Sequence, residues 1–128
     1  MATPALSATT GHLHRQAITA SIPMLASLLQ DVLSRRLTAY ITGVKDAKTV
    51  ARWANGEITE IRDQAVEQRL RTTYEITRLL LEGDSAQTVR AWFIGLSPEL
   101  GDVSPAEAIH EGQLREALAA ARLFAFAG

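Results

Sequence analysis

The sequence predicts an all-α fold of about six or seven helices, and three observations lead to that prediction. Hydrophobic residues make up 47% of the 128-residue chain and recur at spacings of three and four, which place them on one face of a helix. No segment alternates between apolar and polar residues with the period of two that a half-buried strand requires. Capping residues, prolines and glycines indicate where individual helices begin and end.

The first part of the chain is expected to hold a flexible tail followed by two helices. Residues 1–15, which are small and polar at their start, are predicted to form the tail. Pro23 suits the first turn of a helix that extends to about Leu29, because its φ is fixed and it lacks a backbone N–H. Apolar residues over 32–41 predict a second helix, which Gly43 would end because glycine tolerates positive φ.

Two further helices are expected in the middle of the chain. The first contains Trp53 and ends at residues 55–56, an Asn-Gly pair that fits a left-handed cap. A connector over 57–62 follows. Asp63 then opens the longest helix, which Gly83 ends.

The last part of the chain predicts three helices. Asp84 is expected to cap the first of them, which ends at Gly95. Ser104, followed by a proline and then by a returning glutamate, opens the second, and Gly112 closes it. Apolar residues at helical spacing over 113–126 predict the last helix.

The formal net charge of −1 hides an uneven distribution of charge. Residues 35–52 contain five basic residues and one acid, a net +4, whereas residues 82–128 contain seven acids and three basic residues, a net −4. A cationic region can meet a polyanion that an acidic region would repel. We therefore place a boundary near Gly83, with domains over 16–83 and 84–128.

Composition excludes several classes of protein. The chain has no cysteine, so it has no disulfide framework, thiolate metal site or cysteine nucleophile. It has no apolar run long enough to span a membrane, and its start lacks the basic and apolar regions of a secretory signal. The expected compartment is the cytoplasm.

Isolated polar residues do not form a convincing catalytic or metal site. His12 and His14 lack a third ligand nearby, and His110 is best explained by its favourable place at the end of a helix. Glu67 and Arg71 have the i, i+4 spacing of an ion pair on a solvated helix face. No phosphate-binding loop or nucleophile motif is present, so we expect no enzyme activity, cofactor, metal or small-molecule substrate.

Residues 37–53 have the pattern of a helix-turn-helix. Ala39 is small where two helices would approach closely, and Gly43 permits the positive φ of the turn. Val50 and Trp53 mark the buried stripe of the second helix. The residues that would then face outward can contact phosphates and base edges, and they are Lys45, Lys48, Thr49 and Arg52.

This segment resembles the helix-turn-helix of the Xre (lambda-repressor-like) family. In that family a Thr-Val pair and a Trp precede a Gly on the recognition helix, and here these residues are Thr49, Val50, Trp53 and Gly56. The interval from Gly43 to Thr49 is one residue longer than in the family, and Asp46 can absorb the extra residue by capping the helix. Because four net charges attract phosphate only modestly, we expect a homodimer that binds two half-sites of operator DNA.

Residues 89–112 present a Trp, a Gly, a Pro, a Leu, a Ser-Pro pair and a final Gly in that order. We expect Trp92, Phe93 and Leu100 to be core residues rather than binding residues. The order resembles the C-terminal toxin-binding domain of the Xre/MbcA/ParS antitoxin family, over roughly residues 84–128. The resemblance implies a bacterial antitoxin that represses its own operon and covers the active-site cleft of a RES-domain toxin, an enzyme class that consumes NAD.

The end of the chain carries two of its seven aromatic residues, although chain ends are usually polar. By the same resemblance this tail would enter the toxin's cleft, which is built for an anionic dinucleotide, while two arginines pair with acids at the rim. The implied toxin-binding residues are Arg115, Arg122, Leu123, Phe124, Phe126 and Gly128. In the alternative, Phe124 and Phe126 close the chain's own hydrophobic core.

Two other functions remain open on the sequence. The chain could be a stand-alone helix-turn-helix transcriptional regulator whose C-terminal bundle only oligomerises. It could also be an adaptor whose helix-turn-helix no longer binds DNA, because such hairpins persist in proteins that bind only protein.

Overall fold

The computed structural model describes the backbone of residues 3–127 and the side chains of residues 11–127. Within that range the chain is all-helical, as predicted, with no strand and one isolated bridge between Ser97 and Val103. No helix in this range is long and apolar enough to cross a membrane. The elements are α1 (Thr3–Thr19), α2 (Ile22–Val32), α3 (Arg35–Thr42), α4 (Ala47–Ala54), α5 (Gln64–Leu81), α6 (Ala86–Ile94), the 3-10 helix η1 (Pro98–Leu100), α7 (Pro105–His110) and α8 (Leu114–Ala127).

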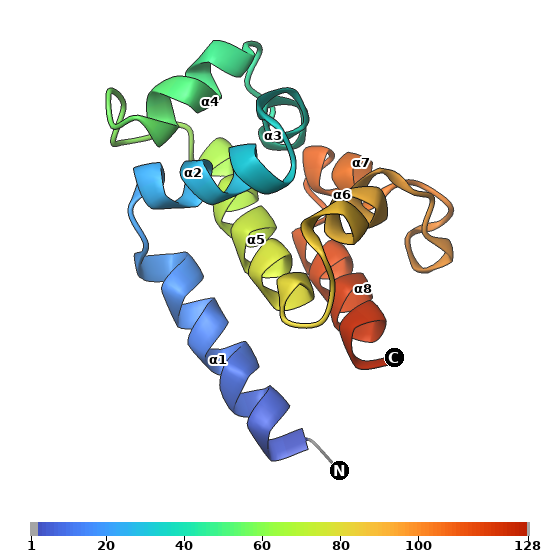
Figure 1. Ribbon diagram of the computed structural model, residues 1–128. Helices are drawn as coiled ribbons and strands as arrows, with labels where there is room; N and C mark the ends of the chain where they lie inside the picture. The colour runs from blue at the N-terminus through green and yellow to red at the C-terminus, as the bar shows by residue number, and fades with distance from the viewer. Residues whose placement is uncertain (1–2, 128) are drawn as a thin grey trace.

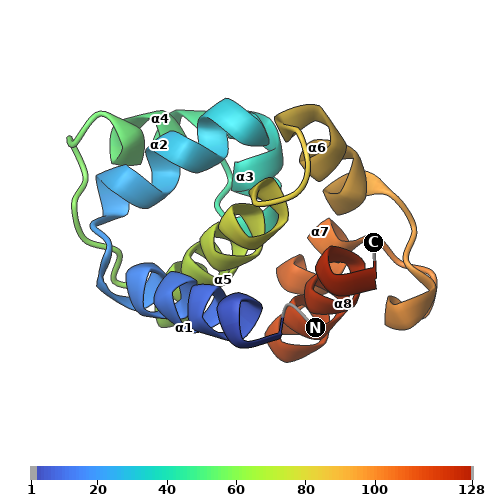
Figure 2. The same cartoon turned by 60° about the horizontal axis from the view of Figure 1, so that its bottom comes forward.

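Helix α5 is the centre of the molecule. It is the longest element, with 18 residues, and both α1 and α8 pack against it (Figures 1 and 2). Helices α2, α3 and α4 gather at one end of α5, where α4 packs against α2 and α3 (Figure 1). Helix α7 bridges the two groups, because it contacts both α3 and α8.

The hydrophobic core is continuous across the predicted boundary near Gly83. Leu25 and Leu70 belong to the same buried cluster as Phe93 and Ile109, which lie beyond that boundary. Residues 84–128 have only a small second cluster of their own, made by Leu100, Ala108 and Ala120, with Trp92 and Val103 packed against it. The basic and the acidic part of the chain therefore pack as one body.

Most predicted helix starts are confirmed, and two are wrong. Asp63 and Ser104 cap helices as expected. The helix expected from residue 32 begins instead at Arg35, because Ser34 adopts a φ of 91° and accepts a hydrogen bond from the N–H of Leu37. The expected cap Asp84 is replaced by Ser85, whose hydroxyl oxygen accepts the N–H of Thr88 at 3.2 Å.

The predicted flexible tail over residues 1–15 is wrong within the described residues, which are helical from Thr3 onward. Leu13, Ala17 and Ala20 are spaced four and three residues apart, and all three are buried. This spacing gives α1 one apolar stripe that packs against α5. Because the first residues of the chain are small and polar, this apolar stripe was not recognised in the sequence.

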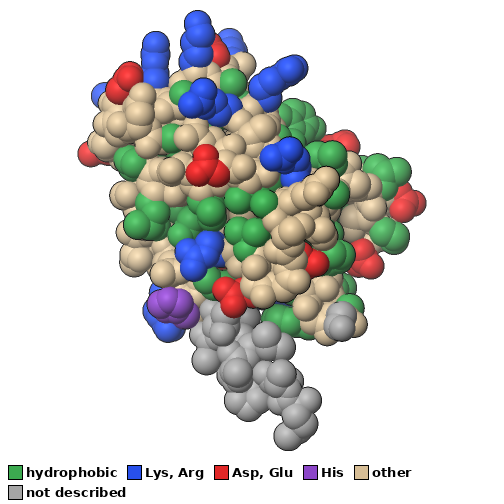
Figure 3. Space-filling model, in the orientation of Figure 1, with side chains coloured by type: hydrophobic (Ala, Val, Ile, Leu, Met, Phe, Trp, Pro, Cys, Tyr) green, Lys and Arg blue, Asp and Glu red, His purple; other side chains and the backbone are tan. Residues whose placement is uncertain are grey.

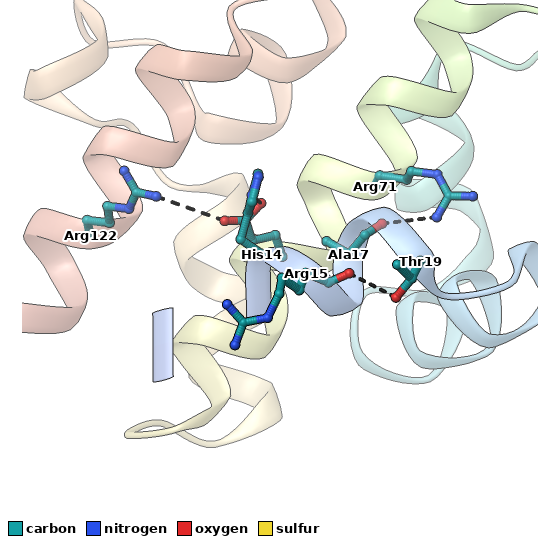
Figure 4. A network of polar contacts seen from close by, with 7 residues as sticks. His14, Arg15, Ala17, Thr19, Arg71 and Arg122 are labelled. Atoms are coloured by element: carbon teal, nitrogen blue, oxygen red, sulfur yellow. Dashed lines mark hydrogen bonds and ion pairs between the residues drawn. The ribbon is translucent and has the colours of Figure 1, made fainter. Parts of the chain in front are cut away.

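Arg71 fastens the end of α1 to α5. Its Nη1 donates a hydrogen bond to the carbonyl oxygen of Ala17 at 3.0 Å (Figure 4). The same Nη1 donates to the carbonyl oxygen of Ala20 at 2.8 Å, and Nε donates to Glu67 at 2.9 Å. The expected ion pair with Glu67 is therefore present, but the Arg71 side chain is only 23% exposed. Its guanidinium satisfies the last carbonyls of α1, which no residue of that helix can reach.

We expect Arg71→Ala to lower the free energy of unfolding by about 2 kcal/mol, because it removes charge-assisted hydrogen bonds from partly buried carbonyls. The loss corresponds to a melting temperature lower by roughly 6–10 °C for a domain of this size. Arg115→Ala is the control, since Arg115 is exposed and forms no ion pair among the described residues. Equal melting temperatures for the two variants would contradict the capping role.

Candidate functional site

Helices α3 and α4 form a tight hairpin joined by residues 43–46. Gly43 ends α3 at a φ of 91°, and its N–H donates to the carbonyl oxygen of Ala39. Asp46 caps α4 as the sequence suggested, and its Oδ1 accepts the N–H of Lys48 at 2.8 Å. Helix α4 buries Val50 and Trp53, so its opposite face is turned outward.

The outward face of the hairpin is basic. Of the residues predicted to bind DNA, Lys45, Lys48 and Arg52 are exposed and Thr49 is half-buried. Lys and Arg side chains gather at this end of the molecule, whereas acidic and hydrophobic side chains alternate on the side where α6 and η1 lie (Figure 3). The basic and acidic segments of the sequence therefore also lie on different parts of the folded molecule.

The structure adds Arg36 to this basic face. Arg36 and Lys45 line a hollow of about 370 Å³ beside the turn, which also includes Gly43, Asp46 and His110. The sequence marked Arg36 only as part of the basic stretch. Its place beside Lys45 depends on the turn that folds α4 back along α3.

The cations of this face are largely free of intramolecular ion pairs. Arg52 has one long contact, from its Nε to Oε2 of Glu57 at 3.9 Å, and both side chains are exposed. Such a pair is weak because water screens it. Among residues 11–127, Arg36, Lys45 and Lys48 make no ion pair, so their charge is available to an external anion.

A stacked pair of rings joins this hairpin to the C-terminal part of the chain. The rings of Tyr40 and His110 are 4.4 Å apart and 7° from parallel, and Nδ1–H of His110 donates to the carbonyl oxygen of Tyr40 at 2.6 Å. Partial burial raises the pKa of the Tyr40 phenol, with smaller contributions from the carboxylates of Glu107 and Glu111. The phenol is therefore neutral at pH 7 and can donate a hydrogen bond from the edge of the basic face.

A second surface of interest is the last part of α8. Leu123 is 60% exposed, Phe124 41% and Phe126 45%. The alternative in which both phenylalanines close the chain's own core is therefore wrong. The ring of Phe124 is tilted relative to that of Trp92, and the two ring centroids are 6.2 Å apart. The predicted contact Gly128 lies outside the described residues.

The fully buried residues of α8 are small, and Leu114 and Leu118 pack beside them, partly buried. Ala117, Ala120 and Ala121 are buried, and they let the backbone of α8 pack closely against its neighbours. The sequence could not distinguish these two arrangements, because alanines and phenylalanines both occur at helical spacing.

The two arginines predicted to bind a toxin differ in their surroundings. Arg115 is exposed. Arg122 is 44% exposed, and its Nη2 lies 4.0 Å from Oε2 of Glu75 (Figure 4). Glu75, only 7% exposed at its side chain, also accepts a hydrogen bond at 3.0 Å from Nδ1 of His14 when that nitrogen is protonated.

Glu75 therefore links α1, α5 and α8, a role that the sequence did not indicate. It lies between Tyr74 and Ile76, both buried, and nothing in its neighbours predicts a buried carboxylate. The contact from Arg122 to Oε2 of Glu75 is long, and that oxygen accepts no hydrogen bond among the described residues. Arg115 and Arg122 are both exposed, and both stay predicted toxin-binding residues.

A scan against protein-family models, a search of curated proteins and a search of solved structures each found no match for this chain. Two surfaces of the molecule differ clearly in chemistry. One is a basic helical hairpin, and the other is an exposed apolar end flanked by acids.

Proposed function

We propose that this chain is a cytoplasmic antitoxin. It would bind its operator through a helix-turn-helix formed by α3 and α4, and it would neutralise a RES-domain toxin with its C-terminal helices. The observation that supports this proposal is the presence of two chemically opposite surfaces on one core. The basic face contains Lys48 and Arg52, and the apolar end of α8 contains Leu123 and Phe126.

The basic hairpin suits the recognition of DNA. Helix α4 is held from behind by Val50 and Trp53, so Lys48, Thr49 and Arg52 would meet the major groove on a rigid support. Lys45 and Arg36 flank the same face and would contact phosphates. A homodimer on two half-sites would double the number of phosphate contacts and supply useful affinity.

The apolar end of α8 suits the inhibition of an enzyme by steric cover. Exposed aromatic side chains on a rigid helix can enter a cleft and lose little conformational entropy there. Inhibition of this kind needs no chemistry from the antitoxin. Acids near the rim, such as Glu82 and Asp84, would meet the basic groups that a dinucleotide-binding cleft carries.

A stand-alone DNA-binding regulator is the second candidate. The observation that favours it is the same exposed apolar end, because two copies could bury these side chains against each other. In that case the C-terminal part would only oligomerise, and DNA binding would not respond to any partner.

Growth of bacteria that express a RES-domain toxin, encoded next to this chain, separates the two candidates. Coexpression of the full chain is expected to restore growth, and the purified proteins are expected to elute as one complex. A dimer that binds the upstream DNA but neither rescues growth nor binds the toxin would establish the regulator instead.

A further inference from the structure

A groove between α6 and α8 lies next to the exposed end of α8. It encloses about 430 Å³ and is lined mainly by Trp92, Leu96, Pro98 and Phe124. Leu96 is 75% exposed, the highest value among the large hydrophobic residues with described side chains, and Ile94, two positions earlier at the end of α6, is 59% exposed. Contiguous apolar surface of this kind is uncommon on a monomer and marks contact sites for other molecules.

The exposure of Leu96 is built into the fold. Its neighbour Ser97 is buried, donates its N–H to the carbonyl oxygen of Val103 at 3.0 Å and accepts the N–H of Asp102 at 2.9 Å. These bonds close the loop after α6, and Leu100 within the loop is buried. The closed loop therefore keeps the Leu96 side chain exposed to water. This exposure is unfavourable in free energy, and burial against a partner would remove that cost.

The charges around the groove indicate what can occupy it. Glu99 lines the groove, and Glu82 and Asp84 line a neighbouring hollow beside Phe126. A second copy placed symmetrically on this surface would bring the same acids face to face, which is unfavourable. A different protein whose apolar side chain is surrounded by Lys or Arg would match both the groove and its rim.

We infer that the α6–α8 groove receives an apolar side chain from a basic surface of the toxin, beside the contact made by the end of α8. The identity of the partner rests on the proposed function. The groove adds Leu96 and Trp92 to the predicted toxin-binding residues, which lie over 115–128 within the predicted toxin-binding domain of residues 84–128.

The groove is tested by titrating the purified RES-domain toxin with Leu96→Glu and Leu96→Lys variants of the full chain. We expect Leu96→Glu to weaken binding by about 10- to 100-fold, because it removes one buried leucine contact. Leu96→Lys should weaken binding further, because it places a cation against the basic surface. Met24→Glu is the control, since Met24 is 57% exposed on α2. Melting temperatures establish that each variant is folded.

Each other outcome has a definite meaning. If both Leu96 variants bind the toxin as the unchanged protein does, the groove is not a contact and the inference is wrong, although the proposed function stands. If the unchanged chain does not bind the toxin, the proposed function fails together with the inference. If sedimentation shows a dimer that Leu96→Glu dissociates, a second copy occupies the groove and the inference is overturned.

Discussion

Deletion of residues 123–128 is expected to abolish neutralisation of the toxin while the protein stays folded. Among residues 123–127 the large side chains of Leu123, Phe124 and Phe126 are all exposed, and only Ala125 is counted with the residues packed against the core. The deletion therefore removes little buried surface but most of the apolar surface at the end of α8. Growth on coexpression with the toxin measures neutralisation, and thermal unfolding measures the fold.

A double substitution separates the end of α8 from the α6–α8 groove. Leu123→Ser with Phe126→Ser leaves Phe124 and the groove intact, and we expect it to weaken toxin binding by about 100-fold or more. Ile18→Ser with Met24→Ser is the matched control, because Ile18 is 58% and Met24 57% exposed at the other end of the chain. Full rescue of growth by the truncated chain would mean that the end of α8 does not cover the toxin's cleft.

Helix caps, the turn at Gly43 and the outward face of α4 could be predicted from the sequence, because each depends on a few neighbouring residues. Asp46 and Asp63 could be identified as helix caps from a single side chain and the few residues after it. Gly43 permits the positive φ at which α3 ends, because glycine has no side chain to clash there. For the same reason the basic face of the hairpin was predictable, since the burial of Val50 and Trp53 fixes which residues of α4 face outward.

Features that depend on contacts between distant segments could not be predicted. Arg71 bonds to carbonyls more than 50 positions away, and Glu75 is buried only because α1 and α8 both pack against α5. The exposure of Leu96 depends on a loop closed by Ser97 and Val103. None of these contacts leaves a periodic signal, so the sequence indicated only that such residues lie on helices or loops.

The second large effect is expected in the hairpin, where Lys48→Glu with Arg52→Glu should reduce operator affinity by at least about 100-fold at 0.15 M salt. These residues lie one turn apart on the outward face of α4, and the change places repulsive charges where phosphates or base edges would lie. Binding of the upstream DNA, followed by gel shift over a range of salt concentrations, measures the effect. The single variants Lys48→Ala and Arg52→Ala should each lower the salt dependence by about one phosphate contact.

The control for this prediction must change the charge equally without touching the hairpin. Arg15→Glu with Arg115→Glu does so, because both arginines are exposed and lie on α1 and α8. If net charge alone governed binding, the two double variants would lose affinity equally, and α4 would have no special role. If α4 is the recognition helix, the control loses little affinity, because charges farther from the DNA than about 8–10 Å are screened at this salt. Unchanged binding by the Lys48 and Arg52 variants would instead show that another face of the molecule meets the DNA.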